Sequence, residues 1–193
     1  MHPKNPFNHD YNFETLIAEY PPLKPFVFEN EHGNYTIKFA DHEAVKALNA
    51  ALLKAHYGIT HWYIPENNLC PPIPGRLDYL LHVADLLPEK EIYLLDIGTG
   101  ANLIYPILAT RHFNWKCTAS EVNLDSLHNA QEIITKNESL KNIDLRHQQF
   151  KTHILEQIIR PPDFLMWQCA IRPFLKTGPM PNRATVGNLK IWN

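Results

Sequence analysis

The chain has 193 residues, of which 45% are hydrophobic and 20% are charged, as expected of one soluble globular domain with a small appendage. Its 18 Lys and Arg residues nearly balance 20 Asp and Glu residues, so the total charge does not demand a nucleic-acid partner. The apolar runs are too short to span a membrane, and Met1-His2-Pro3-Lys4 begins neither a signal nor a transit peptide. We therefore expect a cytoplasmic, monomeric protein that does not bind membranes.

Cysteine and histidine spacing argues against a metal or disulfide framework. The three cysteines, Cys70, Cys117 and Cys169, include no C-x-x-C pair and are interpreted as reduced thiols. None of the eleven histidines takes part in an H-x-x-x-H or H-E-x-x-H pattern. The sequence thus predicts no metal site.

Residues 1–75 predict an α-rich N-terminal appendage. A short helix is expected at 13–19, and the alternating residues at 35–39 predict a short strand. Asp41 is a suitable N-cap for a helix that runs to about Tyr57 and carries one apolar stripe.

A proline-rich stretch separates this appendage from the next helix. Residues 65–74 contain four prolines, which exclude a helix or a central strand and predict a stiff loop, a candidate lid. Arg76 follows the loop, and its planar guanidinium could bind the carboxylate of a ligand. The alternative is a solvated arginine at the start of a helix.

From residue 76 onward, helical and strand patterns alternate, which predicts a doubly wound α/β domain. Right-handed crossovers place the four parallel strands in the order 3-2-1-4. The pattern stops at Gln168, which leaves the fourth strand as an exposed edge. The expected elements are helix 76–87, strand 91–96, helix 102–111, strand 115–120, helix 123–137, strand 142–148, helix 150–159 and strand 163–167.

The stretch 94–102, Leu-Leu-Asp-Ile-Gly-Thr-Gly-Ala-Asn, predicts a strand, a glycine turn and the start of a helix, which together form a nucleotide-binding motif. A dinucleotide fingerprint requires a third glycine, but Leu103 occupies that position. Asp96 ends the strand, where a carboxylate would repel a pyrophosphate and favour a cation. S-adenosylmethionine carries an ammonium and a sulfonium group and no phosphate, so it suits this loop.

The next strand ends in Glu121, about 25 residues after Asp96. A carboxylate at this position can accept hydrogen bonds from both hydroxyls of a ribose. The alternative is that both acids only cap nearby backbone amides. Together, and flanking this loop, the two acids favour a methyltransferase-type site over a dehydrogenase.

Several longer stretches resemble the adenine methyltransferases of bacterial large-subunit (23S) ribosomal RNA and their eukaryotic relatives that act on small nuclear RNA. The resemblance covers roughly residues 1–166. It rests on Met1-His2-Pro3-Lys4-Asn5, Tyr11-Asn12-Phe13, Leu16-Ile17, Tyr20-Pro21, residues 43–49, the run Leu69-Cys70-Pro71-Pro72-Ile73-Pro74-Gly75-Arg76-Leu77-Asp78-Tyr79 and residues 96–106, which end in Ile104-Tyr105-Pro106.

The resemblance implies a Rossmann-like, class I fold that uses S-adenosylmethionine. It also implies that the N-terminal segment holds structured RNA. Asp96, Gly98 and Gly100 would cradle the cofactor, Glu121 would hold its ribose and Arg76 would reach its carboxylate. With Asn102, these residues form the expected cofactor-binding set.

The family's catalytic signature, Asn-Pro-Pro-Phe, is absent after the fourth strand, where Met166 is followed by Trp-Gln-Cys-Ala-Ile-Arg-Pro-Phe. One permitted set of codons for residues 168–178, read one base out of frame, encodes Met-Cys-Asn-Pro-Pro-Phe-Phe-Glu-Asn-Trp. We therefore interpret the chain as frame-shifted near Met166 or Trp167, with natural divergence as the alternative. No catalytic residue is assigned.

These observations predict three segments. Residues 1–75 form an RNA-binding and lid module, residues 76–167 form the first half of a methyltransferase core truncated after the fourth strand, and residues 168–193 form a tail outside the family. The expected function is methyl transfer to the exocyclic amine of an adenine in 23S ribosomal RNA, by a chain that is itself inactive. The alternatives are a non-catalytic RNA- or partner-binding fragment and a methyltransferase for a small molecule or protein.

Overall fold

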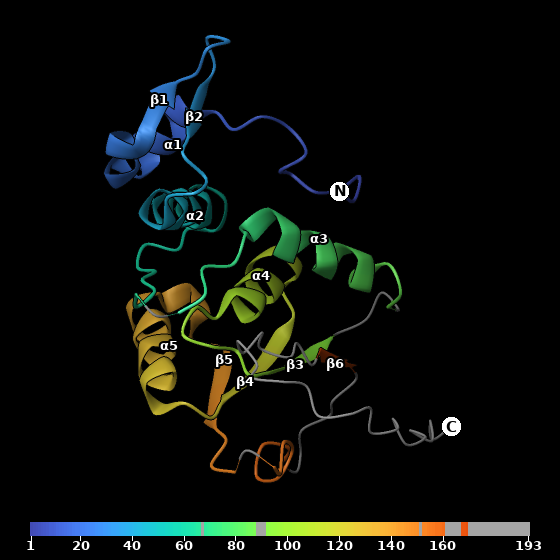
Figure 1. Cartoon of the computed structure of the whole chain (residues 1–193). Coiled ribbons are helices and arrows are strands. Elements are labelled where there is room, and N and C mark those ends of the chain that lie inside the picture. Colours follow the sequence, from blue (N-terminus) through green and yellow to red (C-terminus); the bar gives the residue numbers. More distant parts are fainter. Residues whose placement is uncertain (67, 88–91, 151, 161–166, 170–193) are drawn as a thin grey trace, which may run out of the picture.

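The computed structural model describes residues 1–66, 68–87, 92–150, 152–160 and 167–169. The chain begins with a module of short elements. The longer helix α2 (His42–Tyr57) lies between this module and the main sheet (Figure 1). The module contains α1 (Phe13–Glu19), the 3-10 helix η1 (Pro21–Phe26), and the antiparallel strands β1 (Val27–Glu29) and β2 (Tyr35–Ile37), followed by α2 (His42–Tyr57). The α-rich appendage predicted from the sequence is therefore confirmed, with β1 as an unpredicted partner for β2.

The helix boundaries of this module follow from capping side chains. Asn12 caps α1 by accepting a hydrogen bond from the Thr15 amide at 3.0 Å. Asp41 caps α2 by accepting hydrogen bonds from the amides of Glu43 and Ala44, as the sequence predicts. At the other end of α2, Gly58 adopts a φ of 69°, a left-handed conformation that glycine reaches without strain.

The second part of the chain is a parallel α/β sheet. Its elements are α3 (Ile73–Ala84), β3 (Tyr93–Ile97), α4 (Ile104–Phe113), β4 (Lys116–Glu121), α5 (Leu124–Lys136), the 3-10 helix η2 (Glu138–Leu140), β5 (Ile143–His147) and β6 (Trp167–Cys169). All pairs in the sheet are parallel and the order is β5-β4-β3-β6. This order confirms the predicted 3-2-1-4 arrangement.

Helix packing places the ends of β3 and β4 at the centre of the molecule. Helix α4 packs on β3 and β4, α5 on β4 and β5, and α3 on α4. Helix α2 packs on α1, η1 and α3, so one hydrophobic cluster extends from Phe7 in the N-terminal segment to Ile143 in β5. Among the described residues, no helix is long and apolar enough to cross a membrane.

The predicted helix at 150–159 is wrong, because the described residues of this segment form turns. The Gln148 amide donates to the carbonyls of His153, Ile154 and Glu156, which a helix would pair with its own amides. Gln157 has a φ of 62°, which also interrupts a right-handed helix.

The first helix of the α/β part and its fourth strand have other boundaries in the structure than the sequence predicts. Helix α3 begins at Ile73 rather than residue 76, because Pro74 fits the first turn of a helix, where no backbone hydrogen bond is lost. The sequence predicts the fourth strand at 163–167. The structure places β6 at Trp167–Cys169, and residues 161–166 and 170–193 lie outside the described residues.

Candidate cofactor site

The glycine loop, residues 98–103, connects β3 to α4. Gly98 and Gly100 have φ values of 75° and 68°, which explains why glycine occupies both positions. The amides of Gly98 and Thr99 donate to the Ser120 carbonyl at 2.8 and 3.0 Å. These bonds hold the loop against the carboxyl end of β4, beside Glu121.

Asp96 is buried directly before this loop, with 1% of its surface exposed. Burial raises the pKa of its carboxyl group to about 7; the Thr99 side chain lowers this pKa and the nearby Glu121 carboxylate raises it. Its Oδ2 atom has no hydrogen-bond partner among the described residues. A bound cation would supply the missing partner and favour the ionised form.

Glu121 lies at the end of β4 with 8% of its surface exposed. Its Oε2 accepts a hydrogen bond from the Gly100 amide at 2.8 Å, and its Oε1 accepts from the amides of Val122 and Asn123 at 2.8 and 2.9 Å. Glu121 therefore accepts hydrogen bonds from backbone amides, as one part of the alternative interpretation requires. Binding of a ribose remains a prediction.

Arg76 lies in the first turns of α3 and faces the start of α4. Its Nη1 donates to the Tyr105 hydroxyl at 3.0 Å, and its guanidinium carbon lies 5.6 Å from the centre of the Tyr105 ring. The Nε atom is buried and has no partner in the described part of the chain. Arg76 is therefore not a freely solvated helix-start residue.

Asn102 joins the glycine loop to the helix and to the proline-rich loop. Its Oδ1 accepts from the Ile104 amide at 3.0 Å, and its Nδ2 lies 3.4 Å from the Leu69 carbonyl. Its own carbonyl accepts a hydrogen bond from Trp62 Nε1 at 2.8 Å. The Asn102 side chain therefore holds the turn that leads from the glycine loop into α4.

Sequence reasoning missed two residues of this region. Tyr105 holds Arg76, and its place in the Ile-Tyr-Pro stretch was the available signal. Asn129, on α5, donates to the Ala101 carbonyl at 2.7 Å and to the Tyr63 carbonyl at 2.8 Å. No local pattern marks Asn129, because both of its partners are distant in the sequence.

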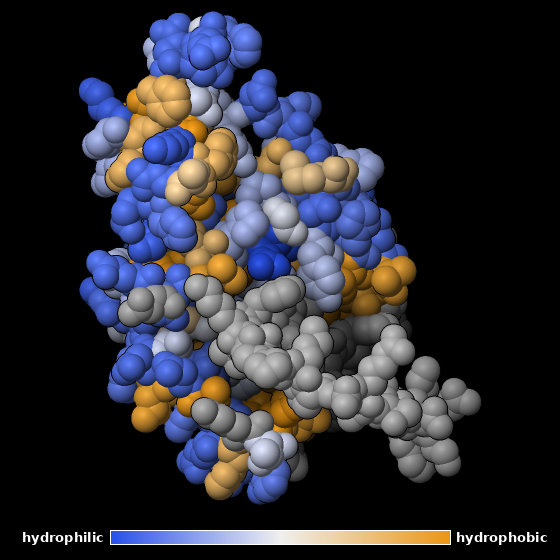
Figure 2. Space-filling model, viewed as in Figure 1, coloured by the Kyte–Doolittle hydropathy of each residue, from blue (hydrophilic) through white to orange (hydrophobic). Residues whose placement is uncertain are grey.

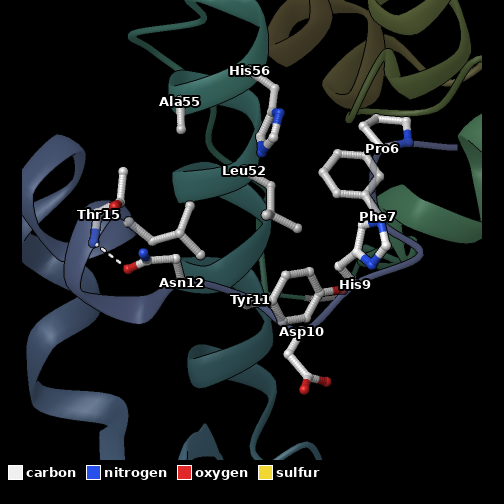
Figure 3. A pocket seen from close by; sticks show the side chains of 11 residues that line it. Pro6, Phe7, His9, Asp10, Tyr11, Asn12, Thr15, Leu52, Ala55 and His56 are labelled. Atoms are coloured by element: carbon white, nitrogen blue, oxygen red, sulfur yellow. Dashed lines mark hydrogen bonds between the residues drawn. The ribbon is translucent and has the colours of Figure 1, made fainter.

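A separate cavity of about 310 Å³ lies in the N-terminal module, between the N-terminal segment, α1 and α2 (Figure 3). The rings of Phe7 and His56 meet edge to face across it, with centroids 4.9 Å apart. The cavity contains none of the predicted cofactor-binding residues. It is lined by Pro6, Phe7, His9, Asp10, Tyr11, Asn12, Thr15, Leu16, Leu52, Ala55 and His56.

The site around the glycine loop combines two buried acids with one arginine. Buried polar atoms without partners are rare in folded proteins, and the described part of the chain has three of them: Asp96 Oδ2 on β3, Thr99 Oγ1 in the glycine loop and Arg76 Nε on α3. An acid and a guanidinium fit a ligand that carries both a cation and a carboxylate, as S-adenosylmethionine does. Within the described ranges, no group of three or more His, Cys, Asp or Glu residues could hold a metal ion.

Comparison with known proteins yields consistent results. A family described as RNA methyltransferase matches residues 1–184. Proteins named "Ribosomal RNA large subunit methyltransferase F" are similar to the chain: the one from Shewanella pealeana is 46% identical over 171 residues, which cover 82% of the chain and 45% of the relative. The one from Christiangramia forsetii is 43% identical over 195 residues, covering 98% of the chain and 68% of the relative.

Solved structures extend the comparison to the fold. The N-terminal domain of human METTL16 in complex with SAH has a TM-score of 0.80 and 29% identity, covering 94% of the chain and 72% of that domain. The hMettl16 catalytic domain in complex with MAT2A 3'UTR hairpin 6 has a TM-score of 0.71 and 33% identity, covering 78% of the chain and 54% of that protein. The Rossmann-like class I fold predicted from the sequence is thereby confirmed.

The family match spans nearly the whole chain, whereas the chain spans only 45% of the Shewanella relative. The matched region includes the glycine loop, both acids and Arg76. The chain belongs to the RNA methyltransferase family that also contains proteins named ribosomal RNA large subunit methyltransferase F.

Proposed function

We propose that this chain binds S-adenosylmethionine. We also propose that it corresponds to part of an enzyme that methylates the exocyclic amine of an adenine in large-subunit (23S) ribosomal RNA. The observation that carries the proposal is that Asp96 and Glu121 flank the glycine loop and Arg76 contacts Tyr105 in the helix that follows it, with unpartnered buried atoms on Asp96 and Arg76. The names of the similar bacterial proteins support the choice of RNA.

Each residue of the site has a distinct role in this proposal. Arg76 would bind the carboxylate of the methionyl group through donors that Tyr105 does not use, and Asp96 would attract its ammonium group. S-adenosylmethionine supplies an electrophilic methyl group on a sulfonium. The reaction needs no covalent intermediate, so the protein contributes by holding the two substrates in line.

Glu121 can serve both the loop and a ribose. A carboxylate offers about four acceptor positions. Three backbone amides, those of Gly100, Val122 and Asn123, already donate to Glu121. One position is therefore free for a ribose hydroxyl, and a second hydroxyl would have to displace one of the three amides. This arrangement couples ribose binding to the position of the glycine loop.

The N-terminal module, residues 1–75, is our candidate for holding structured RNA, with residues 76–167 as the methyltransferase core. Four aromatic residues of the module are exposed, namely Phe28, Tyr35, Phe39 and Tyr63. Figure 2 shows apolar side chains scattered among hydrophilic ones on this part of the surface. Exposed aromatic rings can stack on unpaired bases with little sequence preference, so they suit a near-neutral RNA-binding surface. A ribosomal RNA substrate would place the protein in the cytoplasm, and we propose that it is a monomer.

This chain is proposed to be inactive in methyl transfer. In the family signature, an Asn side chain and a Pro carbonyl accept hydrogen bonds from the adenine amine and a Phe stacks on the base. The Asn-Pro-Pro-Phe signature does not follow Met166 in this sequence. We propose that residues 168–193 are a tail read in a shifted frame, which the nucleotide sequence of codons 160–193 would test.

We expect Glu121→Ala to weaken S-adenosylmethionine binding by about 1–3 kcal/mol, because hydroxyl groups lose a charged acceptor. Isothermal titration calorimetry at fixed pH measures the change directly. The control is Glu138→Ala, which removes an exposed carboxylate paired with Lys141 and distant from the glycine loop. Equal affinity of the wild type and the Glu121 variant would refute the assignment of Glu121.

A further inference from the structure

The backbone of the proline-rich loop is held by asparagine side chains from helices. We define the proline loop as residues 60–66 and 68–72. Prolines have no amide hydrogen, so some carbonyl groups of such a loop need partners from outside it. Asn137, at the end of α5, accepts from the His61 amide at 3.3 Å and donates to the His61 carbonyl at 2.7 Å. Buried Asn49, on α2, donates to the Pro71 carbonyl at 2.9 Å.

A third asparagine, Asn129, makes a different kind of contact. A side-chain amide has two hydrogens, and Asn129 directs them to two loops, with Nδ2 lying 2.8 Å from the Tyr63 carbonyl and 2.7 Å from the Ala101 carbonyl. A second bridge runs beside it, because Trp62 Nε1 donates to the Asn102 carbonyl at 2.8 Å. Consecutive residues of the proline loop are thus fastened to consecutive residues of the glycine loop.

The position of Asn129 also ties this bridge to the ribose-binding acid. Glu121 accepts from the Gly100 amide, and Asn129 donates to the carbonyl of the next residue, Ala101. Helix α5, which carries Asn129, begins three residues after Glu121. Two neighbouring residues of the glycine loop, Gly100 and Ala101, are therefore held by side chains from one continuous segment.

We propose that Asn129 is a positioning residue that sets the spacing between the proline loop and the glycine loop, and thereby the affinity for the cofactor. This inference rests on the proposed function. Without the bridge, the two loops separate in part of the population, and the apparent affinity falls in proportion to the fraction that stays assembled. Within the described part of the chain, the Asn129 side-chain amide donates to backbone carbonyls of the two loops, so its proposed effect on the cofactor is indirect.

The test compares Asn129→Leu, which has a similar size but no donors, with two controls. Gln131→Leu makes the same type of change at an exposed position of α5. Asp41→Ala removes the N-cap of α2 and lowers stability without touching either loop. Calorimetry measures S-adenosylhomocysteine affinity, and hydrogen-deuterium exchange without ligand measures opening of the proline loop.

We expect Asn129→Leu to bind S-adenosylhomocysteine about tenfold or more weakly and to exchange faster in residues 62–72, whereas both controls retain wild-type affinity and exchange there. Asn129→Asp, which also loses both donors, should behave like the Leu variant and replaces it if that variant does not fold. Unchanged affinity or unchanged exchange in a folded Asn129 variant would overturn the inference alone. Failure of the wild type to bind would overturn the proposed function and the inference with it.

Discussion

This chain is expected to transfer methyl groups to large-subunit ribosomal RNA at no more than a background rate. Methyl transfer between a sulfonium and an amine depends on orientation, and the loss of orientation costs several kcal/mol of barrier, or orders of magnitude in rate. The groups expected to orient the adenine amine do not follow Met166. The assay is incorporation of labelled methyl groups into large-subunit RNA that lacks the modification.

The matched comparison is a chain in which the proposed shift of frame after Met166 is corrected, which we expect to restore the Asn-Pro-Pro-Phe signature and the remaining strands of the sheet. We expect this chain to recover turnover and solubility, because the fourth strand would no longer be a sheet edge. Robust turnover by the uncorrected chain would contradict the account and show that other residues replace the signature. RNA binding without turnover by both chains would instead favour the non-catalytic binding function.

Cofactor affinity is expected to rise with pH, by close to tenfold per pH unit well below pH 7 and less steeply near it, and to level off above pH 7. Burial raises the pKa of Asp96 to about 7, so the carboxyl group of the free protein is mostly protonated in this range. A cationic ligand favours the ionised carboxylate, and raising the pH therefore removes the cost of ionising it. Calorimetric titrations with S-adenosylmethionine at a series of pH values give the profile.

The control is Asp96→Asn, which keeps the shape of the side chain but cannot ionise. Its affinity should be low and independent of pH over the same range. For folding the sign is opposite, because the raised pKa means that the folded state binds a proton more tightly than the unfolded state. The free energy of unfolding should therefore decrease as the pH rises from about 4 to about 7, and the Asn variant should lack this decrease. A wild-type affinity that does not change with pH would exclude a role for Asp96 in holding the cation.

The strand order and the glycine loop could be predicted from the sequence because their signals are local. The apolar strand before Asp96 and the two glycines lie close together in the chain, and right-handed crossovers then determine the order of the strands. The helix predicted at 150–159 is wrong for the opposite reason. The Gln148 side chain donates hydrogen bonds to carbonyls in that segment and so competes with the backbone amides of a helix. A pattern of apolar residues does not reveal this competition.

The candidate site was predictable in its residue types but not in its contacts. Asp96 and Glu121 are identifiable from their places at strand ends, yet the three backbone amides that donate to Glu121 depend on the fold of the loop. The partnership of Arg76 with Tyr105 joins residues 29 positions apart. The contact between Asn129 and Tyr63 joins segments that are even further apart, at 66 positions. Such contacts depend on tertiary packing, which periodicity and spacing do not encode.

The most direct test of the central claim, that this site binds S-adenosylmethionine, is a crystal structure of the chain with S-adenosylhomocysteine. The account predicts a ribose hydroxyl within hydrogen-bonding distance of Glu121 and the ligand carboxylate paired with Arg76, next to Gly98 and Gly100. Ligand density elsewhere on the protein, with the glycine loop and Arg76 unchanged, would contradict it.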